Sequence, residues 1–60
     1  MEIIVHRGFT IEVGHSGSQA MPRKAWARHP KGCSVEAIGQ TDREAIDNVK
    51  IEIDKFWDAQ

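Results

Sequence analysis

The residues best suited to chemistry in this chain are His29 and Cys33, which stand four positions apart. Zinc favours imidazole and thiolate ligands, and His6 and His15 could add two more. The same pair could also act as a base and a nucleophile. However, no second cysteine and no further closely spaced histidine completes either arrangement, and a cysteine at the start of a strand usually behaves as a small buried hydrophobe. We therefore predict no metal, no cofactor and no enzymatic activity.

A second candidate is a basic stretch at 23–31 that contains a tryptophan. Cations can follow a phosphate backbone while an exposed tryptophan stacks on a base, which makes nucleic-acid binding the alternative function. The net charge of the chain is −1, whereas a nucleic-acid-binding domain usually carries a basic excess. The simpler interpretation is a solvated strand in which the stems of Lys24 and Arg28 cover Trp26.

Length and composition limit the function further. A chain of 60 residues holds one small domain with a small core, without room for a lined catalytic cleft. The single cysteine cannot form an intramolecular disulfide, so we expect a reducing compartment, the cytoplasm. The sequence has no apolar run long enough for a membrane span, and because an acidic residue and a strand-like segment follow Met1, we expect no signal peptide.

Charge is divided unevenly along the chain. Residues 1–35 hold five cations and two acids, a net charge of +3, and residues 36–60 hold three cations and seven acids, a net charge of −4. The two values together give the total of −1. The folded molecule should therefore present a basic and an acidic side.

Alternating apolar residues predict strands at 2–6 and 9–13. A three-residue turn at 6–8, with glycine in the left-handed conformation, would place Val5 opposite Phe9 and Ile3 opposite Ile11. A two-residue turn would instead pair Val5 with a threonine and mix the two faces, so we reject that register. One long strand bent at the glycine stays open as an alternative.

A second hairpin is predicted from strands at 23–29 and 33–39, joined by a turn at Pro30-Lys31-Gly32. A loop rich in turn formers, at 14–22, separates the two hairpins. The side of the sheet that Trp26 occupies stays open. It either covers the outer face beside the lysine and arginine stems, or it belongs to the core.

An amphipathic helix is predicted at 42–57. Thr41 and Glu44 form a capping-box pattern at its start. Its apolar stripe consists of Ala45, Ile46, Val49, Ile53, Phe56 and Trp57. Its outer side carries opposite charges four positions apart, in the pairs Arg43/Asp47 and Lys50/Asp54. Ile51 lies off the stripe.

The segment from Trp26 to Cys33, followed by Gly39, Thr41, Glu44 and Ala45, resembles the N-terminal domain of HicB-like antitoxins. The resemblance covers residues 9–57 and rests on a W-x-A strand, a proline-containing turn, Gly-Cys, and G-x-T-x-x-E-A at a helix start. It implies a partial ribonuclease-H-like βββα arrangement in a bacterial or phage protein. It also implies a non-enzymatic role in which a toxin partner is neutralised by binding. The chain is expected to lack the DNA-binding domain that many HicB proteins append.

We thus expect a single α+β domain over 1–60, an antiparallel meander of three to four strands (ββββα) with one C-terminal helix on one face. The expected function is a small protein-interaction module, with a protein partner or a weak homodimer and no membrane. An open strand edge and an outer sheet face, with Trp26 and, as a further candidate, Ile4, are expected to bind the partner. The residues expected to contact a partner are Arg23, Lys24, Trp26, Arg28, Lys31 and Ile51.

Overall fold

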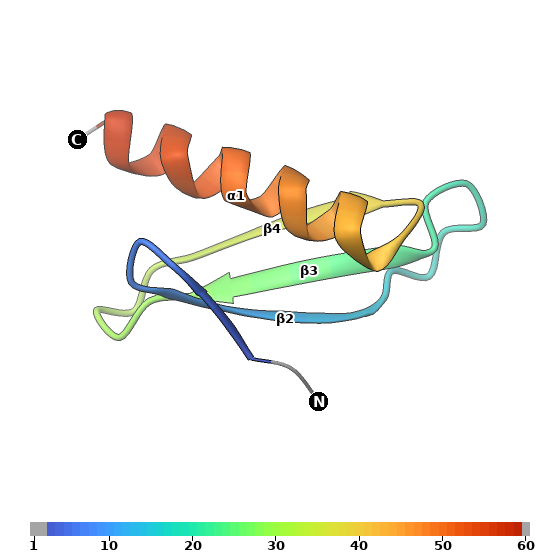
Figure 1. Ribbon diagram of the computed structural model, residues 1–60, viewed down its shortest axis with the longest axis horizontal. Coiled ribbons are helices and arrows are strands. Elements are labelled where there is room, and N and C mark those ends of the chain that lie inside the picture. The colour runs from blue at the N-terminus through green and yellow to red at the C-terminus, as the bar shows by residue number, and fades with distance from the viewer. Residues whose placement is uncertain (1–2, 60) are drawn as a thin grey trace.

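Four antiparallel strands lie side by side in chain order, and a helix crosses one face of their sheet (Figure 1). The computed structural model describes residues 3–59, and all element counts refer to this range. The elements are β1 (Ile4–His6), β2 (Phe9–His15), β3 (Arg23–Arg28), β4 (Ser34–Gly39) and α1 (Asp42–Asp58). This is the predicted α+β meander with a C-terminal helix. Glu2, the first residue of the predicted strand 2–6, lies outside the described residues.

The first hairpin differs from the prediction in its register. Its turn consists of two residues, Arg7 and Gly8, which have φ angles of 50° and 89°. Positive φ at both central positions is the backbone of a type I′ turn, whose twist matches that of the flanking strands. The expected three-residue turn was wrong because it assigned the left-handed conformation to the glycine alone.

Compared with the predicted register, the two-residue turn exchanges the residues of β1 that face the helix with those that face away from it. His6 pairs with Phe9, Val5 with Thr10 and Ile4 with Ile11. The predicted pairings of Val5 with Phe9 and of Ile3 with Ile11 are therefore wrong. Ile4 packs against the core rather than lying on the outer face, and Val5 is 65% exposed.

The core lies between the sheet and α1. Seven side chains are at most 1% exposed, namely Phe9, Ile11, Ala25, Ala27, Ala45, Val49 and Ile53. They alternate along β2 and β3, and they follow the predicted stripe along α1. The alanines of β3 are small enough for the helix to approach that strand closely. At Gly39 a Cβ atom would lie only 2.5 Å from the backbone nitrogen of Ala45, so the helix start rests directly on the end of β4.

Both ends of the helix are fixed by predicted residues. The hydroxyl of Thr41 accepts a hydrogen bond of 3.1 Å from the backbone N–H of Glu44, which confirms the N-cap. At the other end, the rings of Phe56 and Trp57 lie 5.6 and 6.0 Å from the ring of Phe9 in edge-on arrangements. The helix is thereby anchored on the first hairpin. Among residues 3–59, no helix is long and apolar enough to cross a membrane.

Candidate functional site

The sheet face turned away from α1, hereafter the outer face, gathers an aromatic residue and four charges. Trp26 of β3 pairs with Glu12 of β2 on one side and with Glu36 of β4 on the other. Lys24 and Arg28 stand two positions before and after it on β3, and alternation along the strand puts them on the same face. We call these five residues the Trp26 cross. Its two arms across the strands are acidic, and its two arms along the strand are basic.

Trp26 is held in place by close neighbours. A Cβ atom at Gly14 would lie 3.0 Å from its Cζ3 atom, so the indole lies over the bare backbone of β2. The ammonium of Lys24 lies 5.5 Å from the centre of the Trp26 ring and 3.2 Å from a carboxylate oxygen of Glu36. The side chain is only half-buried by these contacts. The structure therefore confirms the first of the two interpretations, with Trp26 on the outer face.

Two aliphatic side chains flank the Trp26 cross at opposite corners of the sheet. Val5 of β1 pairs with Thr10 of β2, which in turn pairs with Arg28 of β3. Ile38 of β4 pairs with Lys24 of β3. Val5 and Ile38 are 65% and 42% exposed. No element within residues 3–59 covers this face. Tryptophan and arginine are enriched in protein-binding surfaces, and this face carries both, Trp26 at its centre and Arg28 beside it.

The residues predicted to contact a partner do not all lie together. Lys24, Trp26 and Arg28 share the outer face. Arg23 alternates with Lys24 along β3, so it lies on the face of the sheet that α1 covers, and it forms an ion pair with Asp42 at the start of α1. Lys31 is exposed in the turn after β3, and Ile51 is 52% exposed on the side of α1 away from the sheet.

Sequence reasoning missed the two acidic arms, Glu12 and Glu36. Both are exposed, and each stands directly opposite Trp26. The signal was present in the alternation of the two strands, but only the pairing register shows which positions flank the tryptophan. The basic stretch is therefore interleaved with acids in space, although it is uninterrupted along the chain.

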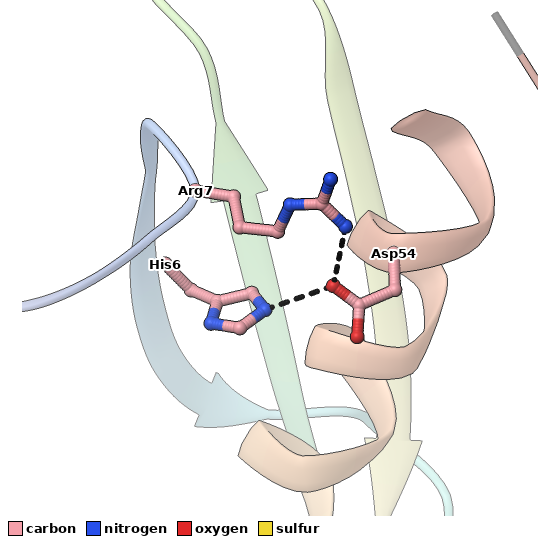
Figure 2. A network of polar contacts seen from close by, with 3 residues as sticks. All are labelled: His6, Arg7 and Asp54. Atoms are coloured by element: carbon pink, nitrogen blue, oxygen red, sulfur yellow. Dashed lines mark hydrogen bonds and ion pairs between the residues drawn. The ribbon is translucent and has the colours of Figure 1, made fainter. Parts of the chain in front are cut away.

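A second polar cluster joins the first hairpin to the helix (Figure 2). His6 Nε2 and Arg7 Nη1 each lie 3.1 Å from Oδ1 of Asp54, and the two side chains reach it from the last residue of β1 and from the turn that follows. The hydrogen bond from His6, followed by that from Arg7, lowers the pKa of Asp54 below its ordinary value of 3.8. The sequence predicted Lys50 as the partner of Asp54. The turn provides other partners because its two-residue form points His6 toward the helix.

His29 and Cys33 make contacts that hold the turn after β3 and the end of the helix in place. The imidazole lies 5.2 Å from the ring of Phe9 and 5.5 Å from that of Trp57, and its Nδ1 accepts a hydrogen bond from the backbone N–H of Lys31. The backbone N–H of His29 donates to the carbonyl of Cys33 across the turn. Among the described residues, no three histidine, cysteine or acidic side chains are grouped to hold a metal ion.

The outer edge of the sheet at β4 is partly occupied. The side-chain amide of Asn48 on α1 donates a hydrogen bond of 2.9 Å to the carbonyl of Ile38. This contact takes up one backbone acceptor that an added strand would need. A strand added at β4, one of the two edges of the sheet, would therefore have to displace Asn48 from this carbonyl.

Comparison of the chain with models of protein families, with curated proteins and with solved structures finds no match.

Proposed function

We propose that the protein is a small non-enzymatic interaction module that binds a protein through the outer face of its sheet. The observation that carries this proposal is the half-buried Trp26 at the centre of a face that the described chain leaves open. Tryptophan is enriched among the residues that dominate binding energy, especially near the centre of an interface. The aliphatic side chains of Val5 and Ile38 widen the apolar area, and the charged arms supply directional contacts.

The resemblance to HicB-like antitoxins supports a more specific form of this proposal. In that form the protein neutralises a toxin by binding it, and the Trp26 cross covers part of the toxin's surface. Such a role needs a binding face and no catalytic group, which agrees with the structural roles of His29 and Cys33. A small toxin-like reading frame beside the gene would be the expected partner, and co-expression should relieve its toxicity.

Site-specific photo-crosslinking in the native host tests the proposal. A benzophenone amino acid in place of Val5 lies on the outer face, and the same amino acid in place of Asp47 lies on the exposed side of the helix. We expect protein adducts from position 5 and few from position 47. Adducts from position 47 alone, or from neither position, would contradict the proposed binding face.

Nucleic-acid binding is the second candidate, and the exposed Arg28 beside Trp26 favours it. The spatial arrangement weakens it, because Glu12 and Glu36 flank the indole and would repel phosphates on both sides. In addition, Arg23 and Lys24 are already paired with acids. A gel-shift experiment with mixed oligonucleotides at low and moderate salt separates the candidates. We expect no shift, and a salt-sensitive shift that Trp26→Ala abolishes would favour the nucleic acid.

A further inference from the structure

We infer that the partner which the outer face fits is a second copy of the same chain, packed face to face with its strands nearly perpendicular. This inference rests on the proposed function, because it names the partner of the same surface, and a toxin that bound this face would displace the second copy. It is carried by the charge pattern of the Trp26 cross, in which acids lie across the strands and bases lie along them. A two-fold symmetric contact is self-complementary only if each patch faces a patch of opposite character.

Aligned packing of two such faces places like charges together. With the two-fold axis parallel to the strands, Glu12 would face Glu36 of the second copy, and Arg28 would face its own counterpart. With the axis perpendicular to the strands, each glutamate would face its own counterpart, and Lys24 would face Arg28. Like charges placed directly opposite one another oppose association.

Orthogonal packing reverses this outcome. Here the two-fold axis lies in the plane of the interface, midway between the strand direction and the direction across the strands. Rotation about it places the strands of the second copy nearly perpendicular to those of the first, so each acidic arm faces a basic arm of the second copy. Neighbouring strands are about 4.8 Å apart and alternate residues of a strand about 6.7 Å apart, so the arms differ by only about 2 Å in length. Flexible lysine, arginine and glutamate side chains span that difference, and Lys24, which pairs with Glu36 within one copy, would exchange that partner for a glutamate of the second copy. Crossing near a right angle is one of the two common arrangements of packed sheets.

The apolar residues fit the same arrangement. Trp26 lies at the centre and its indole lies over Gly14, so the two indoles meet when the axis runs along the diagonal on which Gly14 lies. Val5 and Ile38 lie at opposite corners, and a diagonal axis brings each of them onto its own counterpart or onto the other, depending on the diagonal. Their exposed fractions of 65% and 42% would both fall in the dimer. Apolar burial would drive association, and the charged arms would fix its angle.

Charge inversion in the full-length chain tests this inference. A basic variant carries Glu12→Lys with Glu36→Lys, and an acidic variant carries Lys24→Glu with Arg28→Glu. Sedimentation from low micromolar to near-millimolar concentration should show a wild-type dimer, and self-association of each variant should weaken by about tenfold or more. An equimolar mixture of the two variants should form a mixed dimer, because an acidic cross then faces a basic one. Circular dichroism shows whether each variant is folded.

A matched control carries Asp47→Lys with Asp58→Lys on the exposed side of α1, which changes the net charge by the same amount as the basic variant. It should dimerise like the wild type. A monomeric wild type at every concentration, dimers that persist in both variants, or equal weakening in the control would overturn the inference. If position 5 crosslinks only a different protein and the wild type is monomeric, the second copy is excluded and the proposed function stands. If position 5 crosslinks no protein, the proposed function fails as well.

Discussion

The two faces of the sheet differ in the size and burial of their side chains, and β3 shows this contrast most directly. Its side chains at Ala25 and Ala27 are fully buried under the helix. The intervening side chains at Lys24, Trp26 and Arg28 are large and face away from it. The small side is suited to close helix packing, whereas the large side is suited to contact with another molecule.

This division separates the residues that stabilise the fold from those that are free to bind. The inner face contains apolar groups whose removal leaves a cavity. The outer face contains groups that solvent already reaches, so substitution there should alter association more than folding. Matched substitutions on the two faces should therefore differ in their effect on the free energy of unfolding.

The largest difference is expected between Phe9→Ala and Val5→Ala. Phe9 is 0% exposed and contacts the rings of Phe56 and Trp57, so its truncation should cost about 3–5 kcal/mol of unfolding free energy. Such a loss is comparable to the whole stability of a domain of this size. Val5 lies on the outer face, and its truncation should change stability by only about 0.5 kcal/mol. Urea denaturation measured at a concentration where the chain is monomeric gives both values. Equal losses would contradict the division between the faces.

A smaller difference is expected between two glycines on opposite faces. Gly39→Ala places a Cβ atom 2.5 Å from the backbone nitrogen of Ala45, which cannot move without shifting the helix, so we expect a cost of about 1–3 kcal/mol. Gly14→Ala places its Cβ 3.0 Å from the ring of Trp26, a half-buried side chain on the outer face that can shift more easily than backbone. Gly14→Ala should therefore be milder. The same denaturation series tests this, and a milder effect at position 39 would show that the helix start is not tightly packed.

The helix cap should contribute less than the core contacts. Thr41→Ala removes the hydroxyl that accepts from the backbone N–H of Glu44, and we expect a loss of about 0.5–2 kcal/mol without a change of fold. Thr41→Ser keeps the hydroxyl and serves as the control. An unchanged denaturation midpoint in Thr41→Ala would mean that the cap does not stabilise the helix.

Sequence patterns predicted the strands, the helix and its buried stripe, because these depend on local spacing of apolar residues and on the cap at Thr41. They failed at the first turn, where a non-glycine residue, Arg7, takes a positive φ that sequence alone does not indicate. The resulting shift moved Val5 outward and Ile4 inward. The basic arms of the candidate site were predicted, but the acidic arms were not, because their position beside Trp26 depends on strand pairing.

The smallest expected effect concerns the contact between that first turn and the helix, and it has a pH dependence. Hydrogen bonds from His6 and Arg7 hold the pKa of Asp54 below 3.8, so the folded chain binds fewer protons here than the unfolded chain. The stabilisation is therefore fully present above the ordinary pKa and is lost as the pH falls through the lowered value. Asp54→Asn should be slightly less stable than the wild type at pH 7, and the difference should shrink below about pH 4. Urea midpoints measured along an acid series check this, with Asp47→Asn as a control, since Asp47 makes no ion pair within the described residues. A difference that stayed constant with pH would mean that the carboxylate's charge does not stabilise the turn.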